Sequence, residues 1–477
     1  MIRLLISLTL CIKLFALDTN TTQEITDLQE DTLFHAQREN GLSLHDALNR
    51  AIELSPKIYA AYESVVQSNQ KVAEVEAGHL PTVDLSGDTG YEYRQFALDT
   101  ASPQVNTPIT SSSHYKKIDL YLTITENIWS GGSIENSIDE KDAASKASLY
   151  DYRDKLEALV VDTASAYFDV VYSEIALKVS LKNMKNYEKI LNIVSIKEKN
   201  GAATKGDVNF IKANVDNAKT ELIQRQKALS DAMAQYVYLL QTEDIIELPF
   251  ETSMPIYSED LNSSLMYADE MNAKILRQKS NIQSTKFGFL ATKGTFHPKV
   301  DFSINGETRN EFDIGLGKRE KVNALLTFNY NLYNGSKDEA TAIRLLSKMR
   351  EQKYLYKDLK HKLTFEIKVL HRSVSSLSDS LKLTQSEVLA ARKVVKSYWI
   401  AFKHGTQDLQ ALQLAQRNLN RAEQDYAQYK KDLIINNFEL MRKTGVLLKE
   451  LSIIYNEDAE DFEDEELNLY STFRDLE

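Results

Sequence analysis

The chain has 477 residues, of which 43% are hydrophobic, and a formal net charge of -12 at pH 7. Because nucleic acid is itself negatively charged, this acidic balance excludes nucleic acid as a partner. The sequence has a single cysteine, which excludes an intrachain disulfide and a thiolate metal site.

The first residues have the pattern of a secretory signal peptide, which we predict at 1–16. Arg3 precedes an apolar run at residues 4–12, and cleavage is expected near Ala16. The alternative is a buried N-terminal helix. Cleavage would remove Cys11, so the mature chain would have no thiol, which suits an oxidising compartment.

A polar, acidic stretch at 17–40 is predicted to be a flexible N-terminal segment. The motif Leu42-Ser43-Leu44-His45-Asp46-Ala47-Leu48 opens a short helix that must stop before Pro56, because a residue preceding proline disfavours helical geometry. A second helix is expected from about Lys57 to Ala77, and a strand begins at Thr82.

The strand pattern continues to about Phe96, and Ala101 to His114 is predicted to be an exposed loop because it is rich in serine, threonine and proline. From Lys117 to Trp129 apolar side chains fall on even positions and polar ones mostly on odd positions. This alternation predicts a strand with one apolar and one polar face.

After Ser130-Gly131-Gly132 the period changes to that of a helix. No proline or glycine occurs between Ser133 and Glu198, so a helix on the order of 100 Å long is expected. A turn at 200–207 and a second helical pattern from Val208 to Gln241 complete an antiparallel helical hairpin. A helix this long must stand in a long bundle or coiled coil.

The same order of elements then repeats. The first repeat is assigned to 41–241, the linker to 242–263, the second repeat to 264–454 and an acidic C-terminal tail to 455–477. The second repeat is predicted to contain a helix at 264–292, a strand from Lys299, a loop at 309–321, a strand at 322–332, a long helix at 337–402, a turn at 404–406 and a helix to about 451. The sequence therefore predicts an α+β fold built from two internal structural repeats.

Each of the four strands is long enough to span a bilayer if it is tilted. Four strands do not close a barrel around a lumen, and hydrocarbon does not tolerate an open sheet edge. Several copies of the chain must therefore share one barrel of eight, twelve or sixteen strands. No later segment has the apolar length of a transmembrane helix.

Aromatic residues and glycines mark equivalent strand ends in the two repeats. Trp129 and Tyr333 are candidates for membrane-interface aromatics; the alternative is ordinary packing at a strand end. Gly131, Gly132 and Gly335 are expected to be the joints between strand and helix.

Catalytic and metal-binding patterns are absent from the sequence. The eight histidines lack metal-ligand spacing, and neither a nucleophile elbow nor a His-Glu-x-x-His segment occurs. Carboxylates alternate with lysines on the helices, as expected for solvated faces. We therefore predict no enzymatic activity and no cofactor. The acidic cluster at 457–466 is interpreted as a disordered tail, with divalent-ion binding as the alternative.

Taken together, these motifs resemble the TolC-like outer-membrane efflux and secretion channels, the outer membrane factors. The resemblance runs from Leu42–Leu48 through Leu80-Pro81-Thr82-Val83-Asp84-Leu85-Ser86 and Ile128–Gly132 to Gly201–Val208, and then recurs in the second half. It implies long antiparallel helical hairpins forming an α-barrel tunnel, with four transmembrane strands per protomer. These would close as a trimeric twelve-stranded β-barrel.

The resemblance also implies partners and a location. The expected assembly is a homotrimer in the lipid of the Gram-negative outer membrane that extends into the periplasm. There it would meet a periplasmic adaptor (membrane fusion) protein and an inner-membrane pump of the ABC or RND type. The implied function is a passive channel-tunnel of a tripartite export system, for type I protein secretion or multidrug efflux.

The resemblance places the periplasmic aperture at the two hairpin turns. Candidate aperture residues are Gly201, Asp207, Gly405 and Asp408. Asp207 matches an acidic family position that takes part in closure; the alternative is an aspartate that stabilises its own helix.

The second turn departs from the family pattern. Ala411 and Leu414 stand where well-studied members have an aspartate ring, Phe402 replaces a tyrosine and Gln407 replaces an arginine. The family's locking network therefore cannot form here, and Asp408 is the substitute candidate.

A second class of function remains open from the sequence. It is an elongated periplasmic coiled-coil structural or adhesion protein with no transport role, whose strands would form a soluble sheet. Within the channel reading, the acidic balance predicts a lumen that prefers cations.

Overall fold

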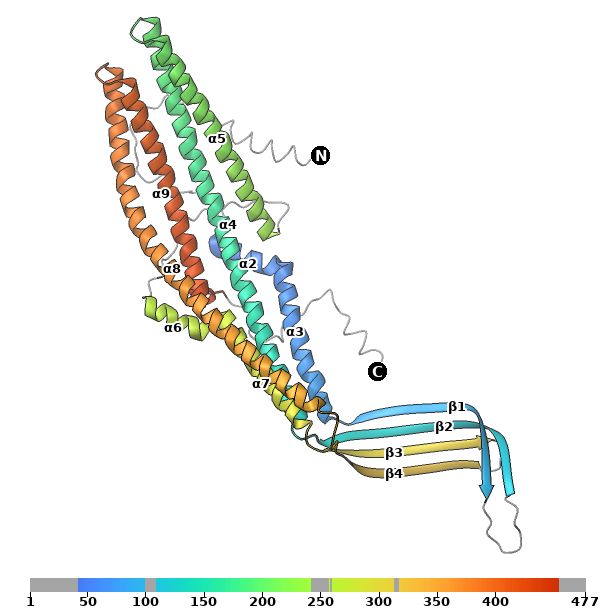
Figure 1. Cartoon of the computed structure of the whole chain (residues 1–477). Helices are drawn as coiled ribbons and strands as arrows, with labels where there is room; N and C mark the ends of the chain where they lie inside the picture. The colour runs from blue at the N-terminus through green and yellow to red at the C-terminus, as the bar shows by residue number, and fades with distance from the viewer. Residues whose placement is uncertain (1–41, 99–108, 242–256, 258–259, 313–316, 454–477) are drawn as a thin grey trace.

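Two helical hairpins form one end of the molecule, and a four-stranded sheet extends from the other end (Figure 1). The computed structural model describes residues 42–98, 109–241, 257, 260–312 and 317–453. The predicted signal peptide, N-terminal segment and acidic tail lie outside these residues, as does most of the linker.

The first repeat contains four helices, a short 3-10 turn and two strands: α2 (Leu44–Leu54), α3 (Pro56–Glu76), the turn η1 (Ala77–His79), β1 (Thr82–Leu98), β2 (Ile109–Trp129), α4 (Ser133–Lys199) and α5 (Lys205–Leu240). The second contains α6 (Leu261–Met271), α7 (Ala273–Gly294), β3 (Lys299–Phe312), β4 (Gly317–Asn329), α8 (Lys337–Lys403), α9 (Leu409–Thr444) and α10 (Leu447–Glu450).

The two repeats agree in length as well as in order. Helices α4 and α8 each have 67 residues, and α5 and α9 each have 36. Ser133 begins α4 and Lys337 begins α8, 204 positions later, and the same offset relates α5 to α9. Each residue of the first hairpin therefore has an equivalent 204 positions later in the second.

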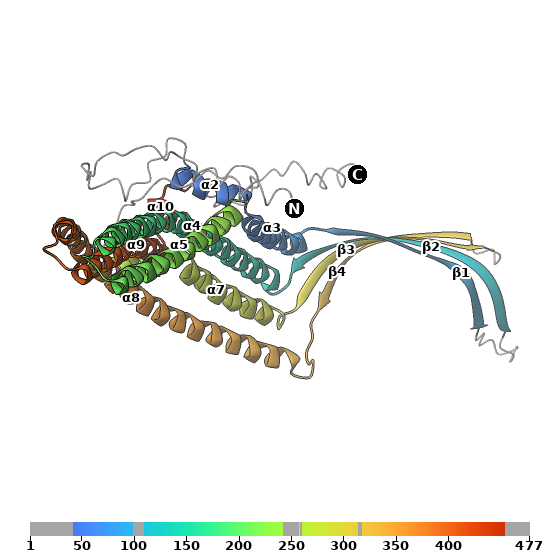
Figure 2. The ribbon, with the colours of Figure 1, turned by 90° about the horizontal axis from the view of Figure 1, so that it is seen from above.

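The strands form one antiparallel sheet in the order β1-β2-β3-β4. The sheet bends away from the helices (Figure 2). The β1–β2 pair Thr82↔Thr125 corresponds to the β3–β4 pair Lys299↔Asn329, so both hairpins have the same register. Directly opposite residues share a face of the sheet, which keeps the apolar side chains of all four strands together.

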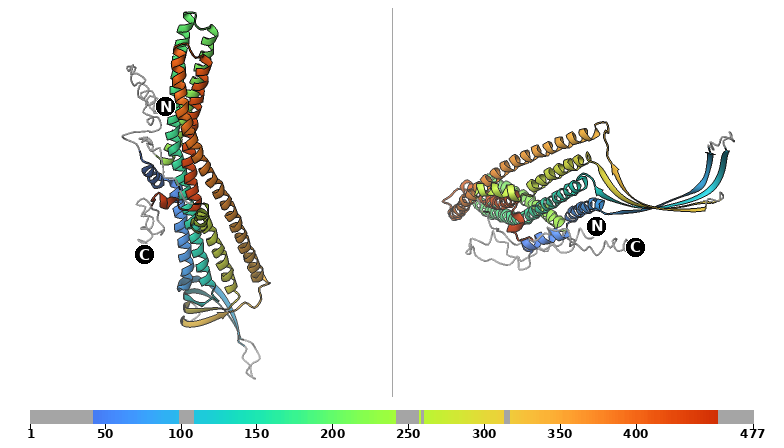
Figure 3. Two further views of the ribbon diagram at one scale, coloured as in Figure 1. Left: turned by 90° about the vertical axis from the view of Figure 1, so that its left-hand side faces the viewer. Right: turned by 90° about the horizontal axis from the view of Figure 1, so that it is seen from below.

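The core consists of separate apolar clusters along the helices. The largest gathers buried side chains of α2, α3, α4, α5 and α9, and the Phe168 and Phe438 rings join α4 to α9 there at 6.4 Å between centroids. A second cluster holds the free ends of both hairpins together around Ile211 and Phe402. The hairpins lie along one another over most of their length (Figure 3).

The structure corrects two predicted helix boundaries. The helix expected at 264–292 is two helices, because the Asn272 side chain accepts hydrogen bonds from the N–H groups of Lys274 and Ile275 and starts α7 anew. The last helix ends at Thr444 rather than near residue 451, because Gly445 adopts a left-handed φ of 79° that ends it.

Both predicted loops between strands are too long. Residues Ile109–His114 belong to β2, β3 continues to Phe312, and β4 begins at Gly317. Threonine tolerates strand geometry well, and pairing with the neighbouring strand satisfies the backbone in the polar stretches. What remains between the strands, 99–108 and 313–316, lies outside the described residues.

Candidate functional site at the hairpin tips and strand ends

The two hairpin turns have the same backbone geometry. Gly201 and Gly405 both have φ of +77°, a left-handed conformation that favours glycine. After Gly201, the N–H of Ala202 donates to the Lys197 carbonyl at 2.7 Å, and after Gly405 the N–H of Thr406 donates to Ala401 at 3.0 Å. These bonds end α4 and α8 with the same cap, so both predicted glycines lie at the hairpin tips.

The carboxylate of Asp207 is engaged by its own helix. The backbone N–H and the hydroxyl of Thr204 donate to it at 2.9 and 2.8 Å, and the N–H of Asp207 donates back to the Thr204 hydroxyl at 3.1 Å. This is a capping box at the start of α5. The hydrogen bonds from Thr204 hold the pKa of Asp207 below its usual range, so the exposed carboxylate stays charged.

Asp408 begins α9 in a similar way. Its side chain accepts a hydrogen bond from the N–H of Ala411 at 2.7 Å, and it occupies the position equivalent to Thr204. Asp207 and Asp408 are thus both near the tips: Asp207 lies in the first turn of α5 and completes its capping box, and Asp408 is the N-cap of α9. Nearby, Leu414 is largely exposed.

Lys197 and Phe402 connect the two hairpins at the tip, a contact that the sequence reasoning missed. The Lys197 ammonium donates to the Phe402 carbonyl at 2.8 Å and lies 4.1 Å from the centre of its ring. The carbonyl belongs to the last turn of α8, where the helix dipole favours a positive charge. Phe402 has no hydroxyl, yet its backbone and ring provide a connection between α4 and α8.

The strand-to-helix joint of the first repeat is tightly packed. Gly131 has φ of +68°, and a Cβ added there would lie 2.5 Å from both the Gly294 carbonyl oxygen and the His297 Cβ. Gly132, with φ of +77°, precedes the first residue of α4. Only glycine fits the Gly131 position, because the backbone is left-handed and the end of α7 fills the space.

The joint of the second repeat is open within one chain. Gly335 has φ of +73°, and no atom of the described chain lies within 4 Å of an added Cβ. Trp129 is 44% exposed, whereas Tyr333 is 81% exposed. The Trp129 ring is tilted relative to the His297 ring, with 6.1 Å between the ring centroids. Trp129 is the last residue of β2, and Tyr333 follows the last residue of β4, Asn329, by four positions.

The polar face of the sheet carries an ion-pair cluster that was not predicted from the sequence. Asp119 of β2 is fully buried and lies 3.2 Å from Arg309 of β3 and 3.4 Å from Lys117. Tyr121 donates to the same carboxylate at 3.3 Å, and Glu307 lies 3.2 Å from Arg309. The polar odd positions of β2 indicated this face, but the partner on β3 depends on the register between repeats.

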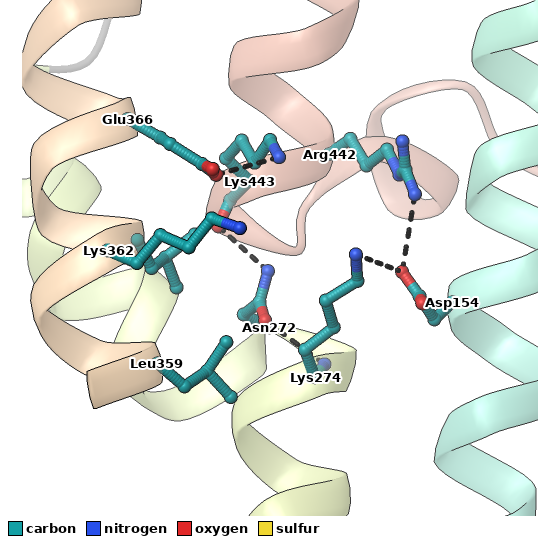
Figure 4. Close-up of a pocket in the computed structure, with 9 residues that line it drawn as sticks. Asp154, Asn272, Lys274, Leu359, Lys362, Glu366, Arg442 and Lys443 are labelled. Atoms are coloured by element: carbon teal, nitrogen blue, oxygen red, sulfur yellow. Dashed lines mark hydrogen bonds and ion pairs between the residues drawn. The ribbon is translucent and has the colours of Figure 1, made fainter. Parts of the chain in front are cut away.

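A cavity of about 170 Å³ lies where α4, α7, α8 and α9 meet (Figure 4). Asp154 binds Lys274 at 3.7 Å and Arg442 at 3.3 Å, while Lys443 binds Glu366 at 2.8 Å. The two ion pairs of Asp154 join the first repeat to the second, so we interpret the cavity as part of the connection between them.

The described residues contain no cluster of three or more His, Cys, Asp or Glu side chains arranged to hold a metal ion. Among the same residues, no helix combines the length and the apolar character needed to cross a membrane.

The sequence of the first repeat matches a known family. Residues 47–240 match the model of the outer membrane efflux protein family. No curated protein matches the chain.

Solved outer membrane channels have the same fold. The Campylobacter jejuni CmeC channel is 13% identical, with a TM-score of 0.72, and the alignment covers 92% of this chain and 94% of CmeC. The open state of the Neisseria gonorrhoeae MtrE channel is 14% identical, with a TM-score of 0.70 and coverage of 88% and 91%. Vibrio cholerae VceC is 14% identical, with a TM-score of 0.70 and coverage of 84% and 96%. The resemblance inferred from the sequence is thereby confirmed.

Proposed function

We propose that this chain, which matches the outer membrane efflux protein family in its first repeat and has that family's channel fold throughout, is the outer membrane channel-tunnel of an export system. Three copies share one barrel, and the helices continue the conduit into the periplasm. The tips meet a periplasmic adaptor and an inner-membrane pump that supplies the energy. The observation that carries this proposal is a sheet with one exposed apolar face and two unpaired edges.

The apolar face of the sheet is continuous across all four strands. It presents exposed large side chains, which include Val83, Leu85, Leu120, Leu122, Phe302, Ile304, Val322, Leu326 and Phe328. A contiguous exposed apolar surface of this size requires a partner, and strands with alternating faces fit the lipid of a bilayer. In a soluble coiled-coil or adhesion protein this apolar face would be exposed to water without a function.

The edges of the sheet require further copies of the chain. Within the described residues, β1 pairs only with β2 and β4 only with β3, so one side of each edge strand has free backbone groups. Hydrocarbon offers no hydrogen bonds, so the edges must pair with one another around a closed barrel. Three copies give twelve strands, enough for an open lumen.

The internal repeat predicts how β4 of one copy pairs with β1 of the next. Within the chain, β2 and β3 pair with Thr125 opposite Ser303. The shared hairpin register makes Asn329 the equivalent of Thr125 and Ser86 the equivalent of Ser303. Asn329 should therefore lie opposite Ser86 of the next copy, on the polar face.

This pairing can be tested by combining S86C with N329C and expressing the protein in Gram-negative cells. In one chain the two positions lie on opposite edges of the sheet, three strand spacings or about 14 Å apart across it. They are also displaced along the strands, because Ser86 aligns with Lys321 of β4 rather than with Asn329, so they are too far apart for a disulfide. We expect a covalent trimer from the outer membrane fraction on a non-reducing gel. A matched control pairs S86C with N323C, shifted about 20 Å along β4, and should stay uncrosslinked.

The same experiment decides between the two classes of function. An outer-membrane trimer with the specific crosslink supports the channel. A soluble elongated product, released without detergent and without a crosslink, would support the structural protein and overturn the proposal.

A further inference from the structure

The four long helices of one chain lie in the order α5, α4, α9, α8, so α4 and α9 form the seam between the hairpins (Figure 1). Helices α5 and α8 are outermost, each with one side not covered by another long helix. The seam between α4 and α9 has polar contacts at several levels. Gln416 of α9 donates to Asn183 of α4 at 3.1 Å, and both residues are buried.

The repeat relates this inner seam to the outer helices. Helix α8 is the equivalent of α4, and α5 is the equivalent of α9. The packing of α4 on α9 within one chain therefore corresponds to packing of α8 of one copy on α5 of the next copy. A closed ring of copies that repeats the internal arrangement must contain this contact between α8 and α5.

Apolar residues on the outer helices agree with this arrangement. Leu383 of α8 is 74% exposed, whereas its equivalent on α4, Val179, is 1% exposed. Ile223 of α5 is 65% exposed, whereas its equivalent on α9, Ala427, is 3% exposed. Large apolar side chains are thus exposed at positions that are buried in the inner seam, as expected if a partner covers them.

Val179 and Ala427 lie at one level of the inner seam. Ion pairs bracket that level: Lys182 lies 3.6 Å from Glu423, and Asp169 lies 2.9 Å from Lys431. By the same equivalence, Leu383 of one copy and Ile223 of the next would share one level of the outer seam.

The charges on the outer helices are complementary. The equivalent of Asn183 is Glu387 on α8, and the equivalent of Gln416 is Lys212 on α5. The neutral amide pair inside the chain thus becomes an acid and a base. Within the described chain, Lys212 is exposed and forms no ion pair, and the Glu387 carboxylate lies 3.9 Å from Arg421 on an exposed surface.

We propose that α8 of one copy packs against α5 of the next copy with Glu387 opposite Lys212. This inference rests on the proposed function, because it requires several copies around one channel. The covalent chain already holds α4 and α9 in place, so an amide pair suffices there. Between separate copies, opposite charges orient the partners and disfavour wrong registers.

A carbodiimide couples a carboxylate to an amine only when the two are in contact, so it tests the pair in the native trimer. Trimers extracted from the outer membrane in mild detergent are treated with the reagent and mapped by mass spectrometry. We expect a peptide pair joining Glu387 to Lys212 and a covalent trimer on a denaturing gel. E387Q should abolish this product, whereas E351Q, at an exposed acid elsewhere on α8, should not.

Charge reversal supplies an independent measurement. E387K and K212E should each lower the temperature at which the trimer dissociates, and the double variant E387K/K212E should restore it. Failure of the double variant to recover any of the loss would contradict a direct pair.

The disulfide between S86C and N329C separates failure of this inference from failure of the channel proposal. If that disulfide forms while Glu387 is not coupled to Lys212, the helical seam is wrong and the channel stands. If neither product forms, both proposals fall.

Discussion

The ammonium group of Lys197 lies 2.8 Å from the Phe402 carbonyl oxygen and directly over the Phe402 ring, which joins the two hairpin tips of one protomer. Both residues belong to the last turns of their helices, so the contact is placed where the hairpins would have to separate if the tip widened.

Removing this ammonium should loosen the tip. We predict that K197M raises the open population of the proposed channel about tenfold, because a charge-assisted hydrogen bond with a cation–π contact contributes about 1.4 kcal/mol. The measurement is open probability in planar lipid bilayers. K199M, at an exposed lysine of the same helical turn, is the matched control and should leave the open probability unchanged. An unaltered K197M channel would show that the contact does not restrain the tip.

Glu157 makes stability depend on pH. Its side chain is 1% exposed and lies on α4 beside the largest apolar cluster. Burial raises the pKa of this carboxyl from 4.5 to about 7. The positive charge of Arg153, whose Nε donates to the carboxylate at 3.0 Å, opposes this rise but does not cancel it. The folded carboxyl therefore binds a proton between pH 4.5 and 7 that the unfolded chain releases. The contribution of Glu157 to stability is greatest below about pH 4.5 and is lost as the pH rises through 7, by up to about 3 kcal/mol.

Thermal unfolding of the detergent-solubilised protein at pH 5 and pH 8 tests this prediction. E157Q should unfold at a higher temperature than the natural protein at pH 8 and show a smaller difference between the two pH values. E188Q, at an exposed acid of the same helix, should retain the original difference. An E157Q variant with an unchanged pH dependence would contradict the assignment.

The long elements could be predicted from the sequence because each is set by a local pattern. The helix expected from Ser133 to Glu198 ends at Lys199, since no proline or glycine interrupts it before Gly201. The strand expected at Lys117–Trp129 was found with its apolar residues on one face, because alternation is a property of neighbouring residues.

Contacts between segments far apart in the sequence could not be predicted in the same way. The break at Asn272 has no proline or glycine; besides the cap that Asn272 provides to α7, its side chain donates to the Lys443 carbonyl at 3.0 Å, far away in the sequence. The contact of Lys197 with Phe402 and that of Asp119 with Arg309 join different repeats. Such pairs follow from the register of the repeats, which no local pattern encodes.

Gly445 should tolerate substitution less well than Gly201. Both have a left-handed φ, +79° and +77°, so alanine costs about 1 kcal/mol of backbone strain at either position. At Gly445 the added Cβ would also lie 2.5 Å from the Met271 backbone, whereas at Gly201 no atom of the described chain lies within 4 Å. We predict a loss of more than about 3 kcal/mol for G445A and about 1 kcal/mol for G201A. Denaturant unfolding monitored by circular dichroism would measure both, and equal losses would contradict the steric argument.

The buried carboxylate of Asp119 should make Arg309 the more important of two neighbouring arginines. Arg309 lies 3.2 Å from Asp119, which is fully buried, while Arg319 occupies the directly opposite position on β4 and is exposed. R309M leaves Asp119 with Lys117 at 3.4 Å as its remaining cation. We predict that R309M destabilises the assembled sheet by about 2 to 3 kcal/mol and that R319M changes it by less than about 0.5 kcal/mol.

The temperature at which the proposed trimer dissociates in detergent measures both effects. The double variant D119L/R309M should be less damaging than R309M alone, because it removes the carboxylate that the single variant leaves incompletely paired. If the double variant is at least as damaging as R309M, the loss comes from packing of the arginine side chain across β2 and β3 rather than from its charge.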